Sequence, residues 1–108
     1  MALAPIEQVS SPNSVTVTGT TYASVVSQYS LFQEKDGLVV INLVGKILQS
    51  TPVNTTLFNI SAHPPTEIWA AENYSFTPVH LYQNGNVQIN RTLSEGDYVG
   101  CTFVYYVS

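Results

Sequence analysis

Cysteine and charge are both scarce in this 108-residue chain. The single cysteine, Cys101, excludes an intramolecular disulfide framework, and its apolar surroundings favour a small buried hydrophobe over a reactive thiol. Only three residues are basic, Lys35, Lys46 and Arg91, against seven acidic ones. Because a phosphate-binding surface needs a stripe of basic residues, we expect neither nucleic-acid binding nor attraction to an anionic membrane surface.

Long apolar runs and helical periodicity are also missing. No run approaches the roughly 20 residues of a membrane span, so we expect no membrane insertion. The N-terminus lacks a basic stretch followed by a continuous apolar one, so we expect no secretion signal. No segment of about twelve residues shows a 3.6-residue apolar period, and we therefore expect no helix.

Signatures of catalysis are missing as well. The two histidines, His63 and His80, are too few for a metal site, which needs three or four spaced ligands. No G-x-S-x-G motif and no glycine-rich phosphate loop occurs. Glu67 with Asp97 or Glu72 could form the carboxylate pair of a glycosidase, but nothing in the sequence sets their separation. We expect no enzymatic activity, no cofactor and no metal.

The residues that are plentiful favour β-structure. Charged residues make up 9% of the chain, while Thr, Ser, Asn, Val and Tyr are common. Short alternating segments recur about every ten residues, which predicts an all-β domain built as an antiparallel β-sandwich or a barrel-like roll. We expect residues 1–25 to be a linker, a neck or the remnant of a preceding domain with a short strand, and residues 26–108 to be a β head domain. Apart from the hairpin discussed next, the expected strands span residues 15–18, 22–26, 28–34, 38–48, 55–60, 66–71 and 98–107.

The clearest local signal is a β-hairpin between Thr77 and Thr92, with Asn84-Gly85 at its turn. A three-residue loop ending at Gly85 keeps apolar residues on one face, whereas a one-residue slip would mix both faces. The predicted pairs are Val79–Ile89 and Leu81–Val87 on the core face, and His80–Gln88, with Tyr82 nearby, on the other. This second face is either presented for binding or simply solvated.

A second hairpin is expected around Lys35-Asp36-Gly37, with a three-residue loop that sets Leu31 opposite Ile41. Its longer strand, 38–48 (LVVINLVGKIL), is apolar on both faces. In an antiparallel sheet such a strand is covered on both sides. Either a second sheet and a loop provide the cover, or another subunit does, and the small size of the chain favours the subunit.

The order of these segments resembles a known family. KDGLVVINLVG is followed by TTLFNISAHPP, by PVHLYQNGNVQI and by a terminal strand. This order resembles the C-terminal head domain of receptor-binding proteins from tailed phages of Gram-positive bacteria, including lactococcal baseplate proteins. In that family a strand ends in a proline-containing turn, here residues 60–65, and a following hairpin carries an Asn-Gly turn, here Asn84-Gly85. The resemblance covers roughly residues 31–108.

The resemblance implies a homotrimeric β head that binds host cell-wall saccharide near subunit boundaries, without catalysis. It also implies attachment to other tail or baseplate proteins through the N-terminus. The protein would then be made in the host bacterial cytoplasm and reside in the virion. Two alternatives stay open: a structural β module of a tail, fibre or capsid, and a lectin-like adhesin domain of a bacterium.

The side chains of the predicted polar surface are of types that bind saccharides. Sugars present apolar C–H faces and a ring of hydroxyls, so their binders combine an exposed aromatic ring with side chains that donate and accept hydrogen bonds. Trp69, the only tryptophan, is either such a platform or a core anchor. The candidate ligand-binding residues are His80, Tyr82, Gln88, Trp69, Glu67 and Asp97.

Overall fold

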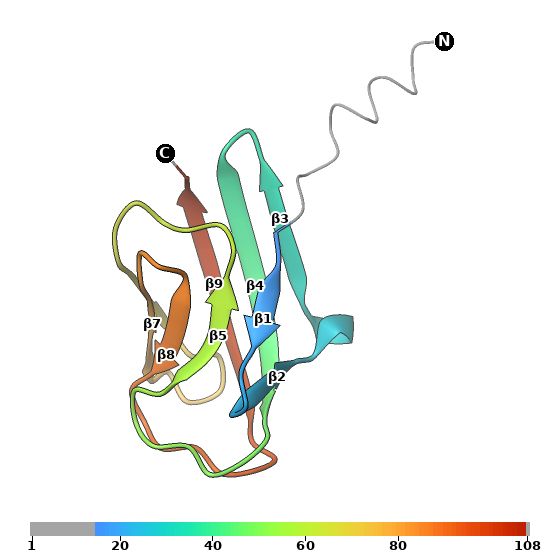
Figure 1. Ribbon diagram of the computed structural model, residues 1–108, viewed down its shortest axis with the longest axis vertical. Coiled ribbons are helices and arrows are strands. Elements are labelled where there is room, and N and C mark those ends of the chain that lie inside the picture. Colours follow the sequence, from blue (N-terminus) through green and yellow to red (C-terminus); the bar gives the residue numbers. More distant parts are fainter. Residues whose placement is uncertain (1–14, 108) are drawn as a thin grey trace.

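The computed structural model describes residues 15–107, which form an all-β sandwich, as the sequence predicts (Figure 1). Within this range the only helical element is a single 3₁₀ turn, η1 (Ser27–Tyr29). The strands are β1 (Val17–Gly19), β2 (Ala23–Val25), β3 (Leu31–Lys35), β4 (Leu38–Ile47), β5 (Thr56–Ile60), β6 (Ile68–Ala71), β7 (Pro78–Leu81), β8 (Asn86–Ile89) and β9 (Tyr98–Tyr106).

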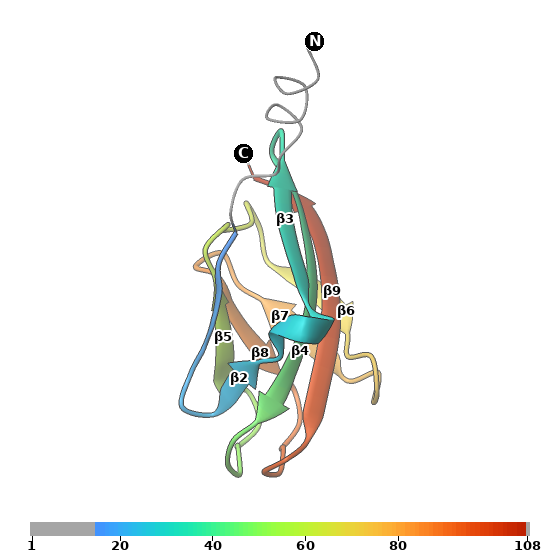
Figure 2. The same cartoon turned by 90° about the vertical axis from the view of Figure 1, so that its right-hand side faces the viewer.

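Every strand pair is antiparallel, and the strands divide into two sheets. The five-stranded sheet has the order β1-β5-β8-β7-β6. The other, called here the β4 sheet, has β4 at its centre, with β9 along one edge and β3 and β2 end to end along the opposite edge. Figure 2 shows the two sheets as separate layers, with β5 in one and β9 in the other.

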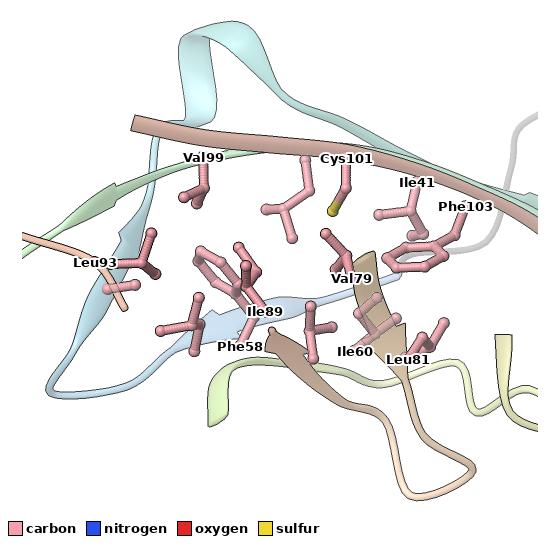
Figure 3. Close-up of a cluster of buried hydrophobic side chains, with 14 of the residues drawn as sticks. Ile41, Phe58, Ile60, Val79, Leu81, Ile89, Leu93, Val99, Cys101 and Phe103 are labelled. Atoms are coloured by element: carbon pink, nitrogen blue, oxygen red, sulfur yellow. The ribbon is translucent and has the colours of Figure 1, made fainter. Parts of the chain in front are cut away.

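The core lies between the inner faces of the two sheets. Ile41, Cys101 and Phe103 of the β4 sheet face Phe58 and residues of β7 in the five-stranded sheet (Figure 3). Alternation along each strand sends these side chains inward, and full burial of one such side chain stabilises the fold by about 1.5–3 kcal/mol. Gly45 of β4 is required by packing, since a Cβ there would lie 2.2 Å from the Phe58 ring.

The central hairpin, β7–β8, has the predicted register. Val79 pairs with Ile89, His80 with Gln88, and Leu81 with Val87. Gly85 adopts φ 89°, so the loop of residues 83–85 uses glycine where a left-handed conformation is needed.

The second hairpin, β3–β4, has a different register from the expected one. Lys35 pairs with Leu38, and Leu31 therefore lies opposite Asn42 rather than Ile41. The loop contains only Asp36 and Gly37, at φ 53° and 86°. Two consecutive residues with positive φ form a tight two-residue turn, and Asp tolerates this conformation well enough to shorten the expected loop by one residue.

The segments before β3 also differ in detail from the expected strands. Residues 27–29 form η1 instead of extending β3, and the hydroxyl of Ser30 accepts the Val44 N–H at 3.0 Å in place of a ladder bond. From the expected neck, β1 pairs with β5 and β2 pairs with β4. The described part of that segment therefore contributes two strands to the sandwich, while residues 1–14 lie outside the described range.

Among residues 15–107, strand β4 is fully covered on one face only. Its inward residues, such as Val39, Ile41 and Leu43, are buried in the core. On the outward face Val40 and Val44 are half-buried and Asn42 is exposed. The expected cover on both sides is thus not provided by a loop among residues 15–107.

Candidate functional site

The outward face of the five-stranded sheet carries most of the predicted site residues. Alternation in β7 and β8 sends Leu81 and Val87 into the core, and it sends His80 and Gln88 outward. We call this surface the polar face; its residues are Thr56, Asn59, Glu67, Trp69, His80, Tyr82, Asn86 and Gln88.

Three aromatic rings stack across the polar face. Trp69 of β6 pairs directly with His80 of β7, and their ring centroids lie 3.8 Å apart at an interplanar angle of 21°. Tyr82, two residues further along the chain, places its ring centroid 3.9 Å from that of His80, at 30°. His80 therefore lies between two larger rings and is only 9% exposed, whereas Trp69 is 58% exposed.

These exposures revise two expectations. His80 was expected to be presented on the surface, but its flanking rings bury it, because neighbouring rings on one sheet face lie close enough to cover each other. The core-anchor alternative for Trp69 is wrong, since its ring lies on the outer face of a sheet edge strand. Trp69 is therefore the exposed aromatic ring, and the His80 ring stacks against one of its faces.

A carboxylate fixes the histidine ring. Nε2 of His80 lies 2.8 Å from Oε2 of Glu67, the residue just before β6. Since an ionised carboxylate only accepts hydrogen bonds, this contact places a proton on Nε2. The Glu67 side chain is itself about half exposed, at 53%, so part of its accepting capacity faces solvent.

Neutral side chains continue the polar face as two linked groups. The Tyr82 hydroxyl donates to Oε1 of Gln88 at 3.2 Å, and Nε2 of Gln88 donates to Oγ1 of Thr56 at 3.1 Å. Next to them, Nδ2 of Asn59 donates to Oδ1 of Asn86 at 2.9 Å. These bonds hold the amides and hydroxyls in fixed orientations, each with capacity left for a further partner.

Asp97 is not part of this arrangement. It lies in the turn before β9, where its carboxylate accepts the Ser94 N–H at 2.8 Å and its carbonyl accepts the Ile47 N–H at 2.8 Å. The structure therefore brings together five of the six predicted residues and leaves Asp97 at the β4 sheet. Asp97 was included without a register argument, and its role here is to cap its own turn.

The charge on the polar face is low and negative. Lys35 and Lys46 point outward from the β4 sheet, and Nζ of Lys46 lies 5.9 Å from the Tyr98 ring centroid. Arg91 follows β8, with Nη2 3.9 Å from Oε1 of the buried Glu72. Glu67 is therefore the one charged side chain that we assign to the polar face, and a neutral ligand suits this surface better than an anionic one.

Among the described residues, Cys101 is buried and the potential metal ligands are scattered. Burial, with a contribution from Glu72, raises the pKa of the Cys101 thiol to about 12, so the thiol stays protonated and unreactive at neutral pH. Residues 15–107 contain no group of three or more His, Cys, Asp or Glu side chains placed to hold a metal ion.

Sequence reasoning missed the loop between β6 and β7. This loop displays Tyr74 and Phe76 on the surface, and Phe76 has a positive φ of 58°. With Trp69 and Pro78, Phe76 lines a shallow apolar hollow of about 460 Å³. No motif marks this loop as a binding site, and hydrogen bonds among Glu72, Ser75 and Thr77 shape it.

Within residues 15–107 no helix has the length and apolar character needed to cross a lipid bilayer. Comparisons with protein-family models, with curated proteins and with solved structures gave no match to this chain.

Proposed function

We propose that this chain is the head domain of a phage receptor-binding protein, which attaches to a neutral host cell-wall saccharide through the polar face without catalysis. The observation that supports this function best is the combination of an exposed tryptophan, Trp69, with a row of fixed neutral amides and hydroxyls. The C–H face of a sugar ring packs on an aromatic ring, while its hydroxyls need partners that both donate and accept.

The hydrogen bonds within the polar face favour binding of this kind. Tyr82, Gln88 and Thr56 are already oriented by one another, so little side-chain freedom is lost when a ligand binds. The stack on His80 holds the Trp69 ring in the same way. Such a site binds each sugar weakly, and several copies on one particle raise the overall affinity through avidity.

A second surface supports self-association into a homotrimer. Leu38 pairs with Tyr106 and Val40 with Val104 on the outer face of the β4 sheet, where Val104 and Tyr106 are largely exposed. With Leu31 of β3, these residues form an apolar patch, and Gln33, opposite Val40, and Lys35, opposite Leu38, lie along its β3 edge. Such a patch suits contact with further copies of the chain, which would cover the outer face of β4, and the number of three copies follows from the family resemblance alone.

The remaining elements of the proposal follow from the family resemblance. Other tail or baseplate proteins would attach through the N-terminal segment, and the head would be carried at the tail tip of the virion. If the chain assembles but binds no saccharide, the structural β module becomes the better description, because only the apolar patch would then be in use.

Calorimetry with purified host cell-wall polysaccharide tests the binding function. Gln88→Ala should weaken binding by about tenfold or more, because sugar hydroxyls lose a fixed amide partner. The matched control is Gln33→Ala, since Gln33 is an exposed glutamine on the outer face of the β4 sheet. Both variants should melt like the parent. Equal binding by parent, Gln88→Ala and Gln33→Ala would refute a role for the polar face.

A further inference from the structure

Phe76 combines strain with exposure. Its φ of 58° lies in the left-handed region, which is unfavourable for a bulky side chain, and its side chain is 79% exposed. Burial in the core therefore does not offset the cost of this conformation. A strained residue that the fold nevertheless holds in place is characteristic of a functional position.

A buried glutamate holds the loop around Phe76. Oε1 of Glu72 accepts the N–H and the hydroxyl of Ser75 at 2.9 and 2.6 Å, and Oε2 accepts the Gly100 N–H of β9 at 2.9 Å. The Glu72 carbonyl accepts the Phe76 N–H at 2.7 Å. The Arg91 guanidinium lies 3.9 Å from the same carboxylate. The loop is thus hydrogen-bonded to both sheets, and the backbone of Phe76 is held in place before any ligand arrives.

The ring of Phe76 bounds the apolar hollow introduced above. The hollow is lined by Trp69, Ala70, Ala71, Phe76 and Pro78, none of which carries a charged group. Trp69 also stacks on His80, so the hollow and the polar face share one ring. A ligand that lies across Trp69 would therefore meet hydrogen-bonding groups on one side and an apolar recess on the other.

We propose that the hollow between Trp69 and Phe76 is a subsite for a methyl substituent on the bound sugar, such as an acetamido methyl or the methyl of a 6-deoxy sugar. This inference rests on the proposed function, and it adds the selectivity of the site. An apolar recess next to fixed hydroxyl and amide groups fits a molecule that carries both characters within the width of one sugar ring. A plain hydroxyl in the same recess would lose part of its hydration and meet no hydroxyl, amide or charged side chain in the lining.

Tryptophan fluorescence gives a direct readout, because Trp69 is the only tryptophan of the chain. The full chain is titrated with two matched pairs of probes: N-acetylglucosamine against glucose, and L-rhamnose against L-mannose. In at least one pair the methyl-bearing sugar should change Trp69 emission at concentrations about tenfold lower than its partner. The pair that shows the difference identifies the substituent.

Variants separate the subsite from the rest of the site. Phe76→Ala should weaken binding of the preferred methyl-bearing sugar about tenfold and leave binding of its unsubstituted partner unchanged. Tyr74→Ala, which removes a neighbouring exposed ring that does not line the hollow, should change neither. Phe76→Leu keeps apolar volume, so its affinity for the methyl-bearing sugar should lie between those of the parent and Phe76→Ala.

The outcomes distinguish this inference from the proposed function. If both sugars of each pair bind equally and Gln88→Ala weakens all of them, the polar face is a saccharide site and the methyl subsite is refuted. If a peptide or a lipid vesicle changes Trp69 emission through Phe76 and no sugar does, both are refuted. If no probe sugar changes Trp69 emission at saturating concentration while the purified host polysaccharide still binds in calorimetry, the methyl subsite is refuted and the proposed function stands.

Discussion

Phe76 is the residue whose backbone departs most from the preference of its side chain. For an L-residue the left-handed conformation costs roughly 1–2 kcal/mol, and glycine avoids that cost. Phe76→Gly should therefore raise the free energy of unfolding by about 1 kcal/mol, even though a large side chain is lost. Thermal melting measures the change.

Asn54 provides the control for this prediction, because it has a similar φ of 60° and is also exposed. Asparagine tolerates this region, so Asn54→Gly should raise the free energy of unfolding clearly less than Phe76→Gly does. A lower melting temperature for Phe76→Gly would mean that the ring contributes to stability through contacts rather than being held for a ligand.

His80 is expected to matter for stability as well as binding. Its ring lies between Trp69 and Tyr82, so His80→Ala should lower the free energy of unfolding by about 1–2 kcal/mol. Denaturant titration measures the loss. Gln33→Ala, on the other sheet, serves as the control, and an unchanged midpoint for His80→Ala would contradict the stacked arrangement.

Two buried acids predict loss of stability at high pH. Burial raises the pKa of the Cys101 thiol from 9.0 to about 12 and that of the Tyr105 phenol from 10.0 to about 12. The unfolded chain therefore loses these protons at lower pH than the folded chain. These two groups should leave the free energy of unfolding unchanged below about pH 9 and lower it from there towards pH 12.

Replacing Cys101 by Ala tests the assignment, because only Tyr105 then contributes to the fall. The onset should move from about pH 9 to about pH 10, as measured by denaturant titration across this range. The same onset in the parent and in Cys101→Ala would show that other groups cause the loss.

At the scale of single elements, the β7–β8 turn depends on glycine for two separate reasons. Gly85 has φ 89°, and a Cβ there would lie 2.3 Å from the Ile60 carbonyl oxygen. Gly96 has the same φ of 89° but open space around it. Gly85→Ala should lower the free energy of unfolding by about 2 kcal/mol or more, and Gly96→Ala should lower it by only about 1 kcal/mol. Equal melting temperatures would show that backbone conformation alone sets the cost.

The two hairpins show what the sequence can and cannot predict about register. In β7–β8 only one register keeps Val79, Leu81, Val87 and Ile89 on one face, so the pattern was sufficient. In β3–β4 the strand 38–47 is apolar on both faces, so a shift of one residue carries little penalty in the pattern. The two-residue turn at Asp36-Gly37 then decides the register, and the Asp-Gly pair, which favours such a turn, was the local signal for it.

The candidate site was predictable to a similar extent. Its polar row follows from the alternation of β7 and β8, and the hairpin register placed His80 beside Gln88. The burial of His80 was missed because it depends on a neighbouring strand, β6, whose position no local pattern fixes. The loop at Phe76 was missed for a related reason, since its conformation depends on contacts of Glu72 with β9.

At the scale of the whole molecule, the apolar patch on the β4 sheet predicts assembly. The chain should form a trimer in solution, and Val104→Lys should convert it to a monomer, because an unpaired charge is costly in an apolar interface. Light scattering after size-exclusion chromatography measures the mass. Gln88→Ala, on the outer face of the five-stranded sheet, should leave the mass unchanged, and a monomeric parent at micromolar concentration would refute self-association through this patch.

The chain crosses between the sheets three times: from β1 to β2, from β4 to β5, and from β8 to β9. Neither sheet is therefore continuous in sequence, and the β4–β9 ladder joins residues about 60 positions apart. Domains dominated by such distant pairings fold slowly, in milliseconds to seconds. During synthesis the apolar strand β4 remains unpaired along its β9 edge until β9 has left the ribosome. Any truncation before Tyr98 would leave a ten-residue β-prone edge unpaired, and aggregation of the nascent chain is the expected fate.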